Sequence, residues 1–226
     1  MPVAFGSSAT AVGDFVSTLT VSAFATAGSD RVGIVHLGGN SEAGAVNGVT
    51  WNGVSMTLVV EFVVGGVVGA SLWRIIAPPT GASDVVATFT PDFSGAMCAS
   101  YFTGVDQTTP IRAGSTGTDG VAGGEVMSVA CASANGDMGI DAAGGSGGAL
   151  SSPLGTQIFN LESVGASDRW GAGSYRASVG ATVTMGWTGA DDCAMVAASL
   201  QAAGGTPATR IPFRDSFGRR RTRYSM

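Results

Sequence analysis

The chain has 226 residues, of which 36 are glycine, 45% are hydrophobic and 12% are charged. This length suits one all-β domain, and the regular spacing of apolar residues excludes a disordered chain. Residues 1–205 carry 5 Arg and 15 Asp or Glu, whereas residues 206–226 carry 6 Arg and one acid, so their formal charges are −10 and +5. The sequence thus predicts an acidic body and a basic tail. The negative charge of the body disfavours binding to nucleic acid.

The first clear strand is Thr18–Phe24, where Leu19, Val21 and Ala23 alternate with hydroxyl-bearing residues. Such alternation is typical of a strand because successive side chains point to opposite faces of a sheet. Arg31–Leu37 is the second predicted strand.

A tight hairpin is predicted at Asn52-Gly53, which joins two strand-prone runs in VTWNGVSMTLVV. Both residues tolerate the positive φ angles of a type I′ turn. Three further strand-like runs follow, punctuated by prolines and glycine. They are Ser71–Ala77, Asp84–Thr90 and Ala96–Gly104.

The second half of the chain continues the same pattern after a predicted loop at about 113–124. The predicted strands are Glu125–Ala132, Asp137–Asp141, Thr156–Glu162, Arg169–Ala177, Ala181–Trp187 and Cys193–Gln201, and Ala143–Gly155 is predicted to be a surface loop. About a dozen short strands at intervals of roughly 8–12 residues indicate a sandwich or barrel. We therefore expect an all-β fold, an antiparallel two-sheet jelly-roll-like β-sandwich.

Three segments follow from these patterns. Residues 1–14 are predicted to be an N-terminal arm, residues 15–203 the β-sandwich domain, and residues 204–226 an arginine-rich C-terminal arm. The N-terminus lacks the basic start and apolar core of a signal peptide. Glycines and charges interrupt the most apolar run, Val54–Ala77, so it reads as sheet and not as a membrane helix.

Cys98, Cys131 and Cys193 each lie inside a strand-like run and form no CxxC pair. We interpret them as buried thiols, in preference to a disulfide or a metal site.

His36 is the single histidine, so it would have to be the general base for any serine nucleophile. Residues 144–148 match GxSxG around Ser146, but a nucleophile elbow needs a strand before it and a helix after it. We therefore expect His36 to be a hydrogen-bonded strand histidine and predict no enzyme activity.

Several aspartates could supply oxygen ligands to Ca²⁺, namely Asp191 with Asp192 and the set Asp119, Asp137 and Asp141. None has EF-hand spacing, and solvated loop acids are the simpler interpretation. No phosphate-binding loop is present either. We predict no metal and no cofactor.

Aromatic residues offer a second kind of site, since tryptophans can stack on sugars. We expect Trp73 and Trp187 to fill the core. Trp51, beside a hairpin turn, and Trp170, beside Asp168, are better placed to be exposed.

The C-terminal arm interleaves arginines with aromatic residues. Arginine forks bind carboxylates and phosphates, and aromatic rings can anchor in pockets. We favour docking on an acidic protein surface over nucleic-acid binding or a solvated terminus. The predicted interface residues are Arg210, Phe213, Arg214, Phe217, Arg219, Arg220, Arg221, Arg223 and Tyr224.

The stretch LWRIIAPPTGASDVVATF followed by SYFTGVDQTTPI resembles jelly-roll-like modules of tailed-phage virion proteins and related bacterial surface proteins. The matching positions are Leu72, Trp73, Pro78, Pro79, Gly81, Val85, Val86, Phe89, Phe102, Gly104, Val105, Asp106, Gln107, Thr108 and Pro110. With the upstream hairpin and TVTMGWT, the resemblance spans most of residues 15–202. It implies virion assembly or surface binding, and it transfers no catalytic residue.

Three functions are compatible with the predicted fold, and the resemblance implies only the first two. The first is a capsid decoration or cement protein, made in the host cytoplasm, that binds the major capsid protein or other virion proteins as a homo-oligomer such as a trimer, without nucleic acid or membrane. The second is a tail-fibre or adhesin-like module that binds cell-surface glycan. The third, a glycan-cleaving enzyme, would need two carboxyl groups facing each other across a cleft. We predict the first, on the capsid surface in preference to the tail.

Overall fold

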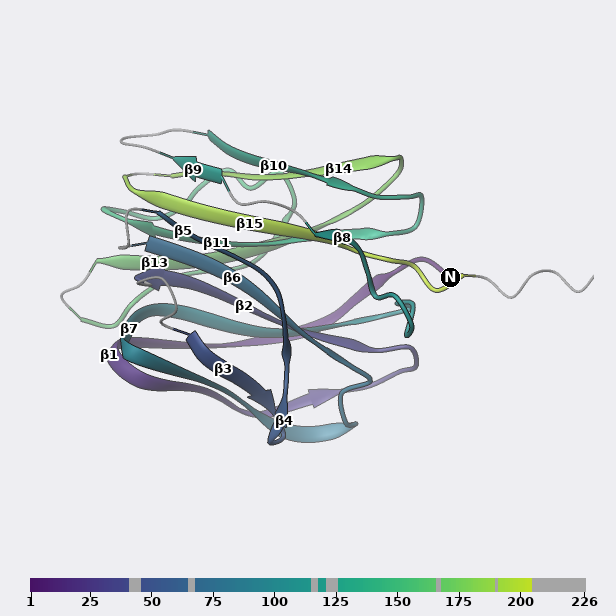
Figure 1. Cartoon of the computed structure of the whole chain (residues 1–226), viewed down its shortest axis with the longest axis horizontal. Helices are drawn as coiled ribbons and strands as arrows, with labels where there is room; N and C mark the ends of the chain where they lie inside the picture. The colour runs from purple at the N-terminus through teal and green to yellow at the C-terminus, as the bar shows by residue number, and fades with distance from the viewer. Residues whose placement is uncertain are drawn as a thin grey trace, which may run out of the picture.

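The computed structural model describes residues 1–40, 46–64, 68–114, 118–120, 126–165, 168–189 and 191–204. Within these ranges the chain forms strands and no helix, and every strand pairing is antiparallel. The predicted all-β antiparallel sandwich is therefore confirmed (Figure 1).

The first sheet contains the strands of the N-terminal half and curls into an almost closed barrel. Its strands are β1 (Ala4–Thr26), β2 (Val32–Asn40), β3 (Val46–Trp51), β4 (Val54–Ser55), β5 (Thr57–Val64), β6 (Val68–Ile76) and β7 (Gly81–Thr103). Their order is β4-β3-β7-β2-β6-β5, with β1 on the other edge of β7. Because a single residue, Met56, separates β4 from β5, the two ends of this order meet.

The second sheet lies against the first and has the order β12-β13-β11-β15-β8, with β9 also paired to β15. Its strands are β8 (Ile111–Gly114), β9 (Thr118–Gly120), β11 (Met138–Ser146), β12 (Thr156–Glu162), β13 (Arg169–Ala177) and β15 (Cys193–Leu200). The sequence did not predict the third layer, a two-stranded outer sheet of β10 (Val126–Ala132) and β14 (Thr182–Thr188). Figure 1 shows it on the far side of the second sheet.

Side chains from alternate positions of one strand fill different cores. On β2, Ile34 packs between the two large sheets, whereas Val35 points into the barrel-like interior of the first sheet. On β11, Ile140 packs between the large sheets, and Ala143 packs under the outer sheet with Trp187. Both strands are therefore buried on both faces, which explains why β11 contains so many small residues.

Backbone of one large sheet contacts backbone of the other at a group of glycines. A Cβ on Gly38 would lie 2.0 Å from the carbonyl oxygen of Ala143 and 3.0 Å from the Cα of Gly171. A Cβ on Gly144 would lie 2.3 Å from the carbonyl oxygen of Gly69. Glycine is required here because backbone from one sheet touches backbone from the other.

Residues 4–14, predicted to form an arm ahead of the sandwich, instead form the first half of β1. They pair with β7 from Ala4 opposite Thr103 to Gly13 opposite Gly95. Their weak alternation misled the prediction, since this half of β1 is only partly buried. Four register shifts interrupt β1 along its length, and such bulges protect an edge strand from pairing with another chain.

Two other boundaries differ from the prediction. The runs before and after Pro91 form one strand, β7, which pairs with β3 before the proline and with β2 after it. Pro91 itself joins no ladder because it has no N–H to donate. The predicted loop at 143–155 begins later than expected, since residues 143–146 continue β11 between two neighbouring strands.

Candidate functional site

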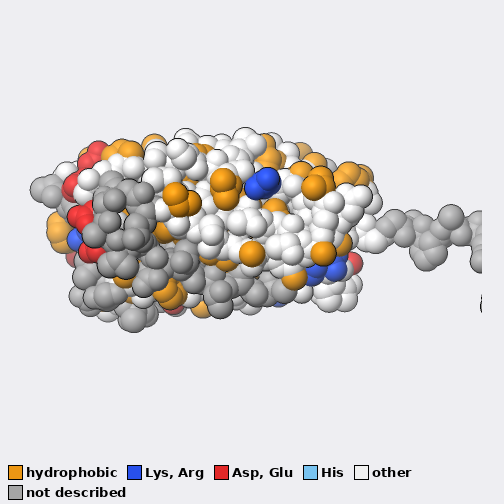
Figure 2. All heavy atoms as spheres, turned by 90° about the horizontal axis from the view of Figure 1, so that it is seen from above, with side chains coloured by type: hydrophobic (Ala, Val, Ile, Leu, Met, Phe, Trp, Pro, Cys, Tyr) orange, Lys and Arg blue, Asp and Glu red, His pale blue; other side chains and the backbone are white. Residues whose placement is uncertain are grey.

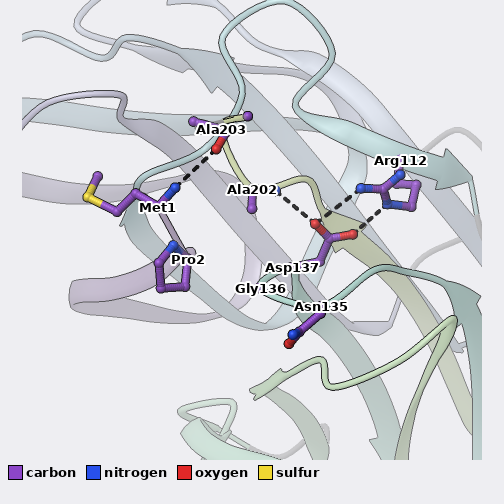
Figure 3. A pocket seen from close by; sticks show the side chains of 9 residues that line it. Met1, Pro2, Arg112, Asn135, Gly136, Asp137, Ala202 and Ala203 are labelled. Carbon is purple, nitrogen blue, oxygen red and sulfur yellow. Dashed lines mark hydrogen bonds and ion pairs between the residues drawn. The ribbon is translucent and has the colours of Figure 1, made fainter. Parts of the chain in front are cut away.

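All nine predicted interface residues of the arm lie outside the described residues. The structure does describe the end of the sandwich that leads to the arm. Gly204, the last described residue, lines a cavity of about 480 Å³, which we call the exit pocket. Its other lining residues are Met1, Pro2, Arg112, Asn135, Gly136, Asp137, Ala202 and Ala203 (Figure 3).

Asp137 organises the wall of the exit pocket. The carboxyl group accepts hydrogen bonds from Arg112 and from the main-chain N–H groups of Ala134 and Ala202, both at 2.8 Å. Burial of Asp137 raises its pKa, but these hydrogen bonds outweigh that effect, and its net pKa lies below the ordinary value. Asp137 is therefore an ionised acid. Its carboxylate joins β8, the turn before β11 and the end of β15.

The chain leaves the sandwich along a path set by main-chain contacts. Ala203 N–H donates to the carbonyl oxygen of Gly104 at 2.8 Å, and Met1 N donates to the carbonyl oxygen of Ala203 at 3.2 Å. Val105 also forms an isolated bridge with Ala202. The base of the C-terminal arm is thus held in one place on the body.

The motif GVDQTTP beside this exit is a structural turn. Asp106 Oδ1 accepts hydrogen bonds from the N–H groups of Thr108 and Thr109, both at 2.8 Å. These two hydrogen bonds place the pKa of the exposed Asp106 below its ordinary value. Asp106 N–H donates to the carbonyl oxygen of Gln201, so the motif ties the end of β7 to the end of β15.

His36 lies between the large sheets and is fully buried. Its Nδ1 is 2.7 Å from the main-chain oxygen of Asp141, and its Nε2 is 2.9 Å from Ser100 Oγ. A carbonyl can only accept, so Nδ1 carries the proton and Nε2 accepts from Ser100. Burial lowers the pKa of His36 to about 4, against the opposing hydrogen bond to Asp141. The predicted hydrogen-bonded strand histidine is confirmed.

The carboxyl group of Asp141 points to the other face of β11. It accepts hydrogen bonds from Ser174 N–H at 2.6 Å, Ser174 Oγ at 2.7 Å and Trp187 Nε1 at 3.1 Å. Burial raises the pKa of Asp141 to about 7, although all three hydrogen bonds act to lower it. The sequence did not predict this network, because Asp141 was interpreted as a solvated acid and is in fact fully buried.

These contacts form no usable Ser-His-Asp centre. Ser100, His36 and Asp141 are all fully buried, so no substrate reaches the Ser100 hydroxyl. The carboxyl group also lies away from His36, which contacts only the main chain of Asp141. Ser146, the residue of the GxSxG match, sits at the buried end of β11, and its N–H donates to the carbonyl oxygen of Asp192.

Two of the aspartates considered as Ca²⁺ ligands, Asp137 and Asp141, are engaged in other contacts. Asp137 is bound to Arg112, and Asp141 is bound to Ser174 and Trp187, whereas the side chain of Asp119 is outside the described residues. Among the residues that the structure describes, no three His, Cys, Asp or Glu side chains form a group that could hold a metal ion.

The four tryptophans are mainly structural. Trp73 and Trp187 are buried in the core, as predicted. Trp51, which the sequence placed better than Trp73 or Trp187 for exposure, is instead fully buried, and its ring fills the barrel-like interior beside Phe24. Trp170 is partly buried, and its indole N–H is covered. Trp51 therefore offers no platform for stacking on a sugar.

A second cavity of about 500 Å³ lies at the hairpin turn and is lined by Ala23, Thr50, Asn52, Gly53, Ala82, Ser83, Asp84 and Val86. Its single carboxyl group, on Asp84, accepts a hydrogen bond from Ala23 N–H at 2.9 Å. The exit pocket also has one carboxyl group. Among the described residues, neither cavity is lined by the pair of carboxyl groups that glycoside hydrolysis requires.

The outer sheet presents a face with few charges. Figure 2, which views the molecule from this side, shows mainly uncharged side chains and backbone, separated hydrophobic groups and one cationic group near the centre. Val126 on β10 is 70% exposed, whereas its neighbour Met127 is buried. Isolated apolar groups of this kind are ordinary on protein surfaces and carry no argument by themselves.

Comparison of the chain with models of known protein families, with curated proteins and with solved structures finds no match. The resemblance to phage virion modules therefore stays a prediction. Within the described part of the chain, no helix is long and apolar enough to cross a membrane.

Proposed function

We propose that this chain is a structural protein of a tailed-phage particle, and specifically a capsid decoration protein that stabilises the shell by binding its outer surface as an oligomer. The observation that carries the proposal is the fixed exit of the arginine-rich arm. Asp137 and Gly104 hold Ala202 and Ala203 by main-chain hydrogen bonds. The arm therefore starts from a defined end of the body.

The division of charge supports the same function. The body, residues 1–205, has a formal charge of −10, and the arm that follows has +5. Arginine forms forked hydrogen bonds with carboxylates, so the arm suits an acidic surface on the major capsid protein or another virion protein. Contacts of the arm would add buried area to the interface of the compact body.

The close packing of the body is suited to a protein that forms part of a rigid shell. Strands such as β2, β11 and β15 are buried on both faces, and the large sheets touch backbone to backbone at glycines. Close packing of this kind resists deformation. The glycan-binding alternative has less support, because Trp51 lies in the core.

The test compares binding to purified capsids that lack the protein. Three chains are needed: the full-length protein, a chain ending at Gly205, and a full-length variant in which the six arginines of the arm are glutamine. We expect co-sedimentation of the full-length protein and a loss of binding of tenfold or more in the other two. Equal binding by all three would remove the arm from the proposal, and no binding by any of them would refute it.

A further inference from the structure

Asp141 is a buried acid at the junction of the second sheet and the outer sheet. It is fully buried, and its carboxyl group contacts Trp187 of β14, a member of the apolar cluster that also contains Met127 and Met185. Its carboxyl oxygens have three hydrogen-bond donors, two from Ser174 on the neighbouring strand and one from Trp187 Nε1. The outer sheet is therefore hydrogen-bonded to the second sheet through this acid.

No cation neutralises Asp141 among the described residues. The strands packed against its strand and the strand β10 of the outer sheet carry the titratable side chains His36, Arg74, Arg169, Tyr175, Arg176, Cys193 and Cys131, whereas β14 carries none. Among the described residues, the partners of the Asp141 carboxyl group are Ser174 and Trp187, and none of the arginines of this set bonds to it. His36 reaches only its main-chain oxygen, and Arg176 donates to the carbonyl oxygen of Thr184.

The neutral acid fits this position without a charge. In the neutral acid Oδ1 still accepts from Ser174 N–H and Trp187 Nε1–H, and the proton on Oδ2 lies on the contact with Ser174 Oγ, whose oxygen accepts it in place of donating. The ionised acid would keep its donors but would bury a negative charge among apolar side chains, and such a charge is costly without a cation.

The outer sheet is the part of the surroundings that can move most easily. It has two strands, which is too few for an independently stable sheet. On the other face of β11, the second sheet packs against the seven-stranded first sheet. Partial opening of β10 and β14 is therefore the conformational change with the lowest free-energy cost that lets water reach an ionised Asp141.

We propose that protonated Asp141 fastens the outer sheet to the second sheet, and that loss of this proton loosens β10 and β14 while the two large sheets stay packed. This inference concerns the body alone and does not depend on the proposed function.

The direction of the effect follows from linkage. Burial raises the pKa of Asp141 to about 7, against an ordinary value of 3.8. Between these values the closed form holds a proton that the open form releases, so the opening equilibrium rises about tenfold for each pH unit. The fastened state is complete below pH 3.8 and is lost as the pH rises to about 7.

The experiment is hydrogen exchange measured by mass spectrometry on the full chain at pH 5 and pH 7, with protection factors corrected for the chemical exchange rate. In the wild type we expect protection of β10 and β14 to fall by up to about a hundredfold, since the opening equilibrium changes about tenfold per pH unit. Protection of β2 and β6 should not change. In Asp141→Asn, whose amide is neutral at both pH values, β10 and β14 should keep equal protection. Asp30→Asn, which alters an exposed acid, is the matched control and should behave as the wild type.

Equal pH dependence in the wild type and in Asp141→Asn, or none in the wild type, would overturn the proposal. If Asp141→Asn does not fold, the ¹³C resonance of the wild-type Asp141 carboxyl group decides the matter. Titration near neutral pH together with the loss of β14 protection supports the proposal. Titration in the ordinary acidic range refutes it.

Discussion

The imidazole of His36 and the carboxyl group of Asp141 are linked through the main chain of Asp141. His36 Nδ1–H donates to the carbonyl oxygen of Asp141 at 2.7 Å, while the carboxyl group points to the other face of β11. Burial shifts the two groups in opposite senses, lowering the pKa of His36 to about 4 and raising the pKa of Asp141 to about 7. Both groups are therefore uncharged between these values.

Opposite shifts predict opposing effects of pH on the free energy of unfolding. Unfolded His36 binds a proton that the folded state excludes between pH 4 and 6.5, so its contribution to stability rises with pH. Folded Asp141 keeps a proton that the unfolded state releases between pH 3.8 and 7, so its contribution falls with pH. In Asp141→Asn only the His36 contribution still varies with pH. Between pH 4 and pH 6.5 we therefore expect the free energy of unfolding of this variant to rise by about 3 kcal/mol more than that of the wild type.

Urea unfolding at pH 4.5, 5.5 and 6.5 measures this difference. In the complementary variant, His36→Asn, only the Asp141 contribution varies with pH. The free energy of unfolding of this variant should therefore fall as the pH rises over the same range. Parallel curves for the wild type and Asp141→Asn would contradict the opposing effects.

Gly38→Ala should prevent the large sheets from closing. The added Cβ would lie 2.0 Å from the carbonyl oxygen of Ala143, and backbone cannot move aside as a flexible side chain can. We expect a loss of at least about 3 kcal/mol, at the upper end for overpacked cores. Gly48→Ala on β3 is the matched control, because its Cβ meets nothing within 4 Å. Thermal unfolding of both variants checks the prediction, which fails if they melt together.

Asp137→Asn should destabilise the wall of the exit pocket. The amide loses the charge that binds Arg112 and replaces one acceptor oxygen with a donor facing other donors. We expect a loss of about 2–3 kcal/mol near pH 7, as for hydrogen bonds to a charged group.

This loss should shrink as the pH falls. The pKa of Asp137 is lowered in the folded state, so its stabilisation is present above the ordinary pKa and disappears as the pH falls through the folded value. Asp106→Asn serves as the control, because an asparagine oxygen can still accept from Thr108 and Thr109. Urea unfolding at pH 7 and pH 3 distinguishes the two, and equal losses in both variants would argue against a special role for Asp137.

The three thiols should be unreactive in the folded protein. Cys98, Cys131 and Cys193 are buried and form no disulfide, as their sequence context predicts, and burial raises the pKa of Cys98 to about 12. A thiol-specific chromogenic reagent should react slowly without denaturant and at least a hundredfold faster in urea, since the thiolate is the reactive form. Fast reaction of any one thiol under native conditions would show that its surroundings open locally.

Local patterns in the sequence predicted several elements closely. Asn52 and Gly53 adopt φ angles of 51° and 76°, and Thr50 pairs with Ser55 across the hairpin, as the dipeptide indicated. The strands Thr156–Glu162 and Arg169–Ala177 have the predicted bounds. Alternation and turn chemistry act over a few residues, so they can be read without a structure.

The sequence by itself determined that the chain is an antiparallel β protein with an acidic body and a basic C-terminal segment, because side-chain periodicity and charge are local properties. Only the tertiary structure decided that β1 begins at Ala4, that a third sheet covers the second, and that Trp51 lies in the core. It also decided that His36 meets Asp141 from 105 positions away. The physical reason is that pairing partners and burial depend on how the curled first sheet closes on the second, and no run of neighbouring residues encodes that closure.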